Sequence, residues 1–272
     1  ATEIGANEKK FNTIKILVAA KEVRVIDNYA KNLNIEKLDL VIDWGILYML
    51  TRPMWFALDF FYKLLGNYGL AIIAVTVSIR ILLFPLAQVS FRSMSRMKLL
   101  QPEITRLKEL NKGDKTKLQQ EMMALYKREK VNPMSGCLPI LPMIFVFFAL
   151  YKVLFVTLDS RHEPFYGWIK DLSVRDPTSV FNLFGLIPWD PPSFLLIGAW
   201  PIAMGISMFI QQKLNPTPPD PIQAKIFMFF PLFLTVILAP FPSGLVIYWT
   251  VNNCLQMLQQ YLVMRKTKVK TI

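Results

Sequence analysis

From residue 67 onward, long apolar runs alternate with short polar stretches. The first run, Leu70–Ala87, approaches the length of about 20 apolar residues that crosses a hydrocarbon core roughly 30 Å thick, and Arg80 lies near its middle. The pattern predicts an all-α polytopic membrane protein whose five transmembrane helices form a bundle, the first in residues 67–90 and four more in residues 134–272. The four later apolar segments are Cys137–Phe155, Phe194–Ile210, Ile226–Ala239 and Gly244–Met264.

The chain before this first span divides into two parts. In residues 1–43, Phe11–Ala20 is rich in β-branched residues, as a strand is, and Lys21–Leu33 has apolar residues at helical spacing. This part is too small to form its own core, so we expect the end of a soluble domain or a tail packed on something else. Residues 44–66 interleave aromatic and charged side chains around Pro53, which is typical of an amphipathic helix in the membrane interface. The alternative is a transmembrane span that the proline breaks.

Residues 91–133 are strongly charged and carry two apolar stripes. Within each stripe the apolar residues recur at helical spacing, and Asn111–Asp114 between them has the composition of a turn, with Asp114 as an N-cap. We therefore expect a helical hairpin. Its stripes are Met97, Leu100, Ile104 and Leu107, then Leu118, Met122 and Leu125.

Charge asymmetry predicts the topology. Basic residues outnumber acidic ones in the hairpin and also end the chain. Because cytoplasmic loops carry an excess of Lys and Arg, we expect the hairpin, the loop at 213–225 and the tail at 265–270 to be cytoplasmic. The nearly charge-balanced loop at 157–193 and the N-terminus then lie on the outer side of the membrane. This topology accounts for the net charge of +12, so nucleic-acid binding is not needed to explain it.

Composition and missing motifs narrow the class of function. Hydrophobic residues make up 53% of the chain and charged residues 18%, against about 25% charged in a typical soluble domain. The sequence has no Walker-type, HExxH or GxSxG motif, and its only histidine, His162, lies in the predicted outer loop. Cys137 and Cys254 lie in apolar runs without metal-ligand spacing. We expect neither an enzyme nor a cofactor or metal site.

Among the side chains of the apolar runs, Arg80 has the highest free-energy cost of burial in the membrane. A charge at the bilayer centre costs at least ~2.5–3.5 kcal/mol on insertion scales, so such a residue normally faces a bundle interior or a wet cavity. Thr76 lies four residues before it on one helix face, and Gln211 and Gln212 end another span. The last span carries a polar stripe of Trp249, Asn252, Asn253, Gln256 and Gln260.

Two interpretations fit these polar residues. They line a wet recess around Arg80 that opens to the cytoplasm, or the amides link helices by hydrogen bonds while Arg80 snorkels to the interface. The depth of Arg80 favours the recess. The apolar runs contain no Asp or Glu, so they offer no residues for a proton relay that depends on carboxylates.

Six stretches of the sequence are specific enough for comparison: SIRILLFPL (78–86), QPEITRLKE (101–109), QQEMMALYKREKVNPMSGCLP (119–139), PFYGWIKDLSVRDP (164–177), QQKLNP (211–216) and FPSGLVIYWTVNN (241–253). They resemble the YidC membrane protein insertases, and the resemblance extends from about residue 20 to the end. It implies five spans around a hydrophilic groove open to the cytoplasm and to lipid, a positive residue at the position of Arg80, and functional residues at the positions of Thr76 and Trp249. It also implies a bacterial inner-membrane location, with residues 1–43 as the end of a periplasmic domain whose main body and preceding transmembrane anchor this chain lacks.

The resemblance implies an insertase and chaperone that takes nascent membrane proteins into the groove and releases their apolar segments to lipid. We expect Met94, Met97, Met122 and Met123 of the hairpin to form an adaptable receiving surface, because methionine side chains fit varied apolar partners. The basic hairpin and tail are expected to contact the ribosome or the targeting machinery, and the Sec translocase is an expected partner. A channel or secondary transporter that uses the same polar cavity is the alternative, and an assembly scaffold that binds clients without moving them is a third possibility.

Overall fold

The computed structural model describes residues 16–111, 113–132, 140–189, 191–192, 195–215 and 221–269. The chain forms two compact units, residues 1–43 and 44–272. In the smaller unit, helix α1 (Val23–Asn32) and the 3-10 helix η1 (Leu38–Val41) follow an irregular segment. The predicted helix at 21–33 is thus confirmed.

The predicted strand at Phe11–Ala20 is wrong in its described part. Residues 16–20 have no regular structure, and residues 11–15 lie outside the described part. A strand needs a partner strand, and a single β-branched run cannot supply one.

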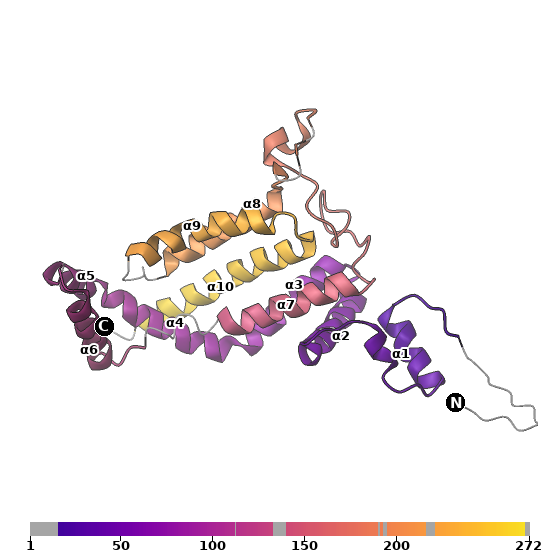
Figure 1. Ribbon diagram of the computed structural model, residues 1–272, viewed down its shortest axis with the longest axis horizontal. Helices are drawn as coiled ribbons and strands as arrows, with labels where there is room; N and C mark the ends of the chain where they lie inside the picture. The colour runs from indigo at the N-terminus through magenta and orange to yellow at the C-terminus, as the bar shows by residue number, and fades with distance from the viewer. Residues whose placement is uncertain are drawn as a thin grey trace, which may run out of the picture. The chain divides into compact units, whose positions relative to one another are not determined.

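In the described part of the larger unit all regular secondary structure is helical (Figure 1). Helix α10 packs against α8, α3 and α4, helix α2 packs against α3 and α7, and α8 packs against α9. The all-α prediction is confirmed at this level. The helices are α2 (Tyr48–Leu65), α3 (Tyr68–Leu82), α4 (Phe84–Leu99), α5 (Gln101–Leu110), α6 (Lys115–Arg128), α7 (Ile140–Val156), η3 (Val180–Gly185), α8 (Ala199–Leu214), α9 (Pro221–Leu238) and α10 (Ser243–Val269).

The predicted first span at 67–90 consists of two helices. Helices α3 and α4 meet at a 67° bend at Leu83. Pro85 in the first turn of α4 brings no N–H to the break, which is why the helix does not continue straight. Among the described residues, no single helix is long and apolar enough to cross a membrane, whereas this bent pair passes by length and composition. Residue 90, the predicted boundary, lies inside α4.

Helices α5 and α6 are joined by a short turn and pack against each other. Asp114 caps α6, because its carboxylate accepts from the Lys117 amide at 2.9 Å. The two helices enclose a small apolar cluster, formed by Ile104, Leu125 and Tyr126 with Leu100, Leu107 and Met122 at its edge. These residues include most of the two predicted stripes.

Side chains of the loop at 157–198 tie α2 and α8 to the bundle. Trp55 Nε1 on α2 donates to Asp159 Oδ2 at 2.7 Å. The buried Asp176 stabilises the start of α8, because its Oδ2 accepts a hydrogen bond from the Trp200 amide in the first turn, at 2.9 Å. A carboxylate at this position complements the positive end of the helix dipole.

Candidate functional site

Arg80 lies in the last turn of α3 and is 3% exposed. Helix α10 supplies the acceptors for its guanidinium. Nε donates to Asn252 Oδ1 at 2.8 Å, and Nη2 donates to Gln256 Oε1 at 2.9 Å and to the Asn252 carbonyl at 3.1 Å. The arginine therefore does not snorkel to solvent; it is bonded across the bundle to the last helix.

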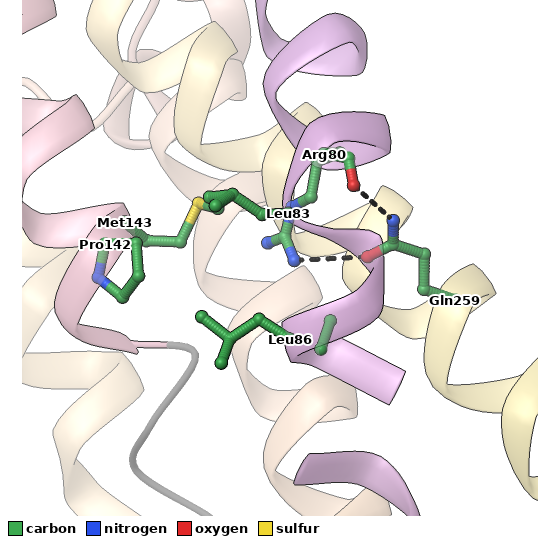
Figure 2. A pocket seen from close by; sticks show the side chains of 7 residues that line it. Arg80, Leu83, Leu86, Pro142, Met143 and Gln259 are labelled. Carbon is green, nitrogen blue, oxygen red and sulfur yellow. Dashed lines mark hydrogen bonds between the residues drawn. The ribbon is translucent and has the colours of Figure 1, made fainter. Parts of the chain in front are cut away.

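Gln259 completes this arrangement from one turn further along α10. Its Oε1 accepts from Arg80 Nη1 at 3.4 Å, and its Nε2 donates to the Arg80 backbone carbonyl at 3.1 Å (Figure 2). The sequence-based stripe did not include Gln259. Asn252, Gln256 and Gln259 are spaced i, i+4 and i+7, so they lie on one helix face. This spacing is the signal in the sequence that identifies Gln259.

The positive charge of Arg80 has only neutral partners in this site. Its four hydrogen bonds go to three side-chain amides and one backbone carbonyl, and no ion pair to it is found within the described ranges. Hydrogen bonds to a charged group contribute about 1.5–3 kcal/mol each, so the amides stabilise the buried cation. They do not cancel its charge.

A small pocket lies beside the guanidinium, between the α3–α4 bend and the start of α7 (Figure 2). Its volume is about 10 Å³, which is room for roughly one water molecule. This is much smaller than the recess expected from the sequence, and α10 rather than bulk water satisfies Arg80. The pocket is lined by Arg80, Leu83, Leu86, Ala87, Pro142, Met143 and Gln259.

The predicted polar stripe of α10 divides between two neighbouring helices. Asn252 and Gln256 face Arg80 on α3. Asn253 and Gln260 face α8 instead: Asn253 Nδ2 donates to Ser207 Oγ at 3.0 Å, and Gln211 Nε2 donates to Gln260 Oε1 at 2.7 Å. These amides link helices, as the second interpretation of the stripe describes.

Three other predicted residues lie apart from the guanidinium contacts. Thr76 Oγ1 donates to the Ile72 carbonyl of its own helix at 2.7 Å. Trp249 packs edge to face on Phe147, with ring centroids 5.0 Å apart. Gln212 Oε1 is buried without a hydrogen-bond partner in the described part of the chain.

The four methionines assigned to the hairpin surface differ in position. Met94 is buried between α4 and α10, in a cluster with Phe91 and Val263. Met97 is half-buried, and Met122 packs at the edge of the α5–α6 cluster. Met123 is the only one of the four that is exposed. Cys254 is exposed, whereas Cys137 lies outside the described residues.

Comparison with known proteins places these features in a family. Residues 60–270 match the family model described as 60Kd inner membrane protein. The chain is similar to the membrane protein insertase YidC of Pelagibacter ubique, at 73% identity over 99% of this chain and 48% of that protein. It is also similar to the YidC proteins of Methylobacterium radiotolerans, at 52% identity over 99% of this chain and 44% of that protein, and of Brucella suis, at 55% over 94% and 42%.

The chain thus spans about half or less of the length of these relatives. A crystal structure described as active YidC insertase with the first transmembrane domain resolved shares the fold. Its TM-score is 0.62 at 24% sequence identity, covering 86% of this chain and 50% of that one.

Proposed function

This chain belongs to the 60Kd inner membrane protein family, and from that membership we propose that it guides segments of nascent membrane proteins into the lipid bilayer. The observation that carries the proposal is the buried charge of Arg80, whose hydrogen-bond partners among the described residues are three amides and a carbonyl. The proposal concerns non-covalent transfer, without a catalytic residue, cofactor or metal.

We propose five membrane crossings, formed by the bent pair α3–α4 and by α7, α8, α9 and α10. Residues 44–66, which contain α2, lie in the outer interface, and α5 and α6 extend into the cytoplasm. Residues 1–43 end a periplasmic domain, the N-terminus is periplasmic and the C-terminus cytoplasmic. The similarity to the YidC fold and the distribution of basic residues support this arrangement.

In the proposed first step, an acidic group of the substrate replaces the amides at Arg80. We assign the structure to a closed state of the site, because four of the five guanidinium N–H groups are hydrogen-bonded to α10 and the adjacent pocket holds roughly one water. A carboxylate forms a stronger hydrogen bond to guanidinium than a neutral amide does. Gln256 and Gln259 can therefore be displaced by a charged residue of the incoming chain.

In the proposed second step, the apolar segment of the substrate moves along α7 and α9 into lipid. Both helices present exposed aromatic side chains, including Phe145 and Phe148 on α7 and Phe229 and Phe233 on α9. Such faces match both lipid and an apolar substrate helix. Shortening the polar path through hydrocarbon lowers the barrier to insertion.

The hairpin and the basic tail are proposed to contact the ribosome or the targeting machinery, and the Sec translocase is a proposed partner of the bundle. The excess of basic residues supports the first proposal. Phosphate contacts make such binding weaken steeply with salt concentration.

Reconstitution tests the proposal directly. The chain is placed in proteoliposomes with a single-span substrate, and protease protection reports whether the outer tail of the substrate crosses. Protection that requires the chain supports insertion. Ion or solute flux without any substrate indicates a channel or transporter, and substrate binding without protection indicates a scaffold.

A further inference from the structure

The segment between Ser179 and Trp189 presents apolar side chains to its surroundings instead of a polar loop surface. Leu186 is 84% exposed, and Leu183 and Phe184 are each 51% exposed. In the sequence, Asp190 is the only charged residue between Asp176 and Lys213. The candidate site described above makes no use of this surface, which we call the outer apolar loop, residues 180–189.

The outer apolar loop has a defined shape. Ser179 caps it, since its Oγ accepts from the Phe181 amide at 3.2 Å and donates to the Leu195 carbonyl at 3.0 Å. The Phe184 amide donates to the Ser179 carbonyl at 2.8 Å, and the Ile187 amide donates to the Asn182 carbonyl at 3.1 Å. Hydrogen bonding within the loop lowers the cost of moving its backbone from water to an apolar medium.

Two residues at the tip adopt a backbone conformation that L-amino acids seldom use. Leu183 and Phe184 have φ values of 47° and 58°. Glycine or asparagine adopts this region at lower cost. Here the turn carries two large apolar side chains that remain exposed, so packing within the chain does not compensate for the strain.

The outer apolar loop lies beside the start of α8. It joins α7 to α8, and the Val180 amide donates to the Ile197 carbonyl, just before α8 begins. Figure 1 shows the salmon segment before α8 extending sideways from the start of that helix, across the direction of α8, α9 and α10.

We propose that the outer apolar loop is a membrane anchor that inserts Leu183, Phe184 and Leu186 into the boundary between headgroups and acyl chains of the outer leaflet. Its aliphatic and aromatic side chains, with Trp189 at its end, match the chemistry of this boundary. The inference rests on the proposed crossing of α7 and α8, because that crossing puts the loop at bilayer level.

Site-specific fluorescence quenching tests the anchor in the full chain. The two cysteines are replaced (Cys137→Ser, Cys254→Ser), and single cysteines are introduced as Leu186→Cys, Lys170→Cys or Phe229→Cys and labelled with bimane. Lys170 is exposed in the same connection, and Phe229 is exposed on α9. The proteins are reconstituted in two sets of phosphatidylcholine vesicles: one contains lipids with a nitroxide near the glycerol end of the acyl chain and is used for positions 186 and 170, and the other contains lipids with a nitroxide near the methyl end and is used for position 229.

We expect quenching at position 186 to be about threefold stronger than at position 170, because an inserted apolar anchor places the label beside the nitroxide. Adding Leu183→Glu should return quenching at 186 to the level at 170, since a carboxylate opposes insertion. Leu183 is exposed, so this change removes little packing.

Two outcomes overturn the anchor and are distinguishable from each other. Strong quenching at 229 with equally weak quenching at 186 and 170 shows that the bundle is in the bilayer and the loop is outside it. A loop that another protein covers would give the same result. Weak quenching at all three positions shows that the proposed crossings are wrong as well.

Discussion

The side chain of Gln259 binds Arg80 at two points. Its amide oxygen accepts from the guanidinium Nη1 at 3.4 Å, and its amide nitrogen donates to the Arg80 backbone carbonyl at 3.1 Å. That carbonyl lies in the last turn of α3, where helical carbonyls lack partners within the helix. One side chain of α10 therefore fixes both the charge and the helix end that carries it.

Gln259→Leu should lower the melting temperature of the chain in detergent. The change keeps the side chain similar in size but leaves the Arg80 carbonyl and Nη1 short of one partner each, at about 1–3 kcal/mol for each buried group. Gln259→Glu should instead slow insertion of substrates with acidic outer tails, because the new carboxylate competes with the substrate for the guanidinium. Thermal unfolding in detergent checks the first statement, and insertion rates with acidic and neutral tails, measured by protease protection, check the second.

Gln260→Leu is the matched control for Gln259. Gln260 bonds to Gln211 on α8 and not to Arg80, so its loss should reduce stability without changing the preference between acidic and neutral tails. Equal insertion of acidic tails by the Gln259→Glu variant and the parent would show that the charge of Arg80 does not contact the substrate.

Arg80→Lys should retain insertion of acidic-tail substrates within about tenfold, which corresponds to about 1.4 kcal/mol. Lysine keeps the charge but loses the forked donors that reach Asn252 and Gln256 together. Arg80→Glu should abolish insertion of the same substrates, because it places a like charge in their path. The control substrate has a neutral tail, for which the two variants should differ much less.

If Arg80→Lys and Arg80→Glu insert acidic tails equally well, the electrostatic role is wrong. Circular dichroism must first show that both variants fold, because each substitution removes the guanidinium that the amides of α10 share.

Gly205→Ala should destabilise the contact between α8 and α9. A Cβ at this position would overlap Thr235 Oγ1, which is committed to the Pro231 carbonyl at 2.7 Å. Overpacking of this kind costs about 1–3 kcal/mol. Adding Thr235→Ala removes the overlapping oxygen. The Cβ of residue 235 then lies 3.3 Å from the Cβ of residue 205, so the double variant should recover part of the loss in thermal stability.

Gly113→Ala serves as the control for this cycle, because nothing lies within 4 Å of a Cβ at that position. Its melting temperature should match that of the parent. A double variant that is as unstable as the sum of the two single changes would show that Gly205 and Thr235 do not meet.

Asp176→Ala should loosen the start of α8. The buried carboxylate accepts from the Trp200 amide, the Thr178 amide and hydroxyl, and Trp168 Nε1. Leaving buried donors unpaired costs about 1–3 kcal/mol each, so hydrogen exchange of the first-turn amides of α8 should accelerate at least tenfold. Arg175→Ala, a neighbouring exposed change, should leave that exchange unaltered; equal acceleration by both would contradict the assignment.

The sequence identified Arg80 as the centre of the site and α10 as its partner, because charge in an apolar run and a polar helix face are both local patterns. Which amide meets which helix depends on how α10 packs between α3 and α8. That packing divides the stripe, so Asn252 and Gln256 contact Arg80 while Asn253 does not. Gln259, by contrast, could have been predicted, because its spacing puts it on the same helix face as Asn252 and Gln256.

The helix boundaries were less predictable than the site. The apolar run through Leu83 is continuous, so hydropathy alone suggested one straight span, although Pro85 marked the break. Met94 was grouped with the charged hairpin by composition, but α4 continues to Leu99 and buries it against α10. Local charge thus misplaced a residue whose position tertiary packing decides.

The position of Arg80, three residues before the bend at Leu83, links the charge to a joint in the backbone. Gln259 latches both the guanidinium and the carbonyl next to that joint, so a ligand that pulls the amide from the charge also unlatches the backbone. By thermodynamic reciprocity, any force that changes the angle between α3 and α4 then changes the affinity of Arg80 for its ligand. In the proposed insertion step, site occupancy and helix angle are therefore one coupled equilibrium.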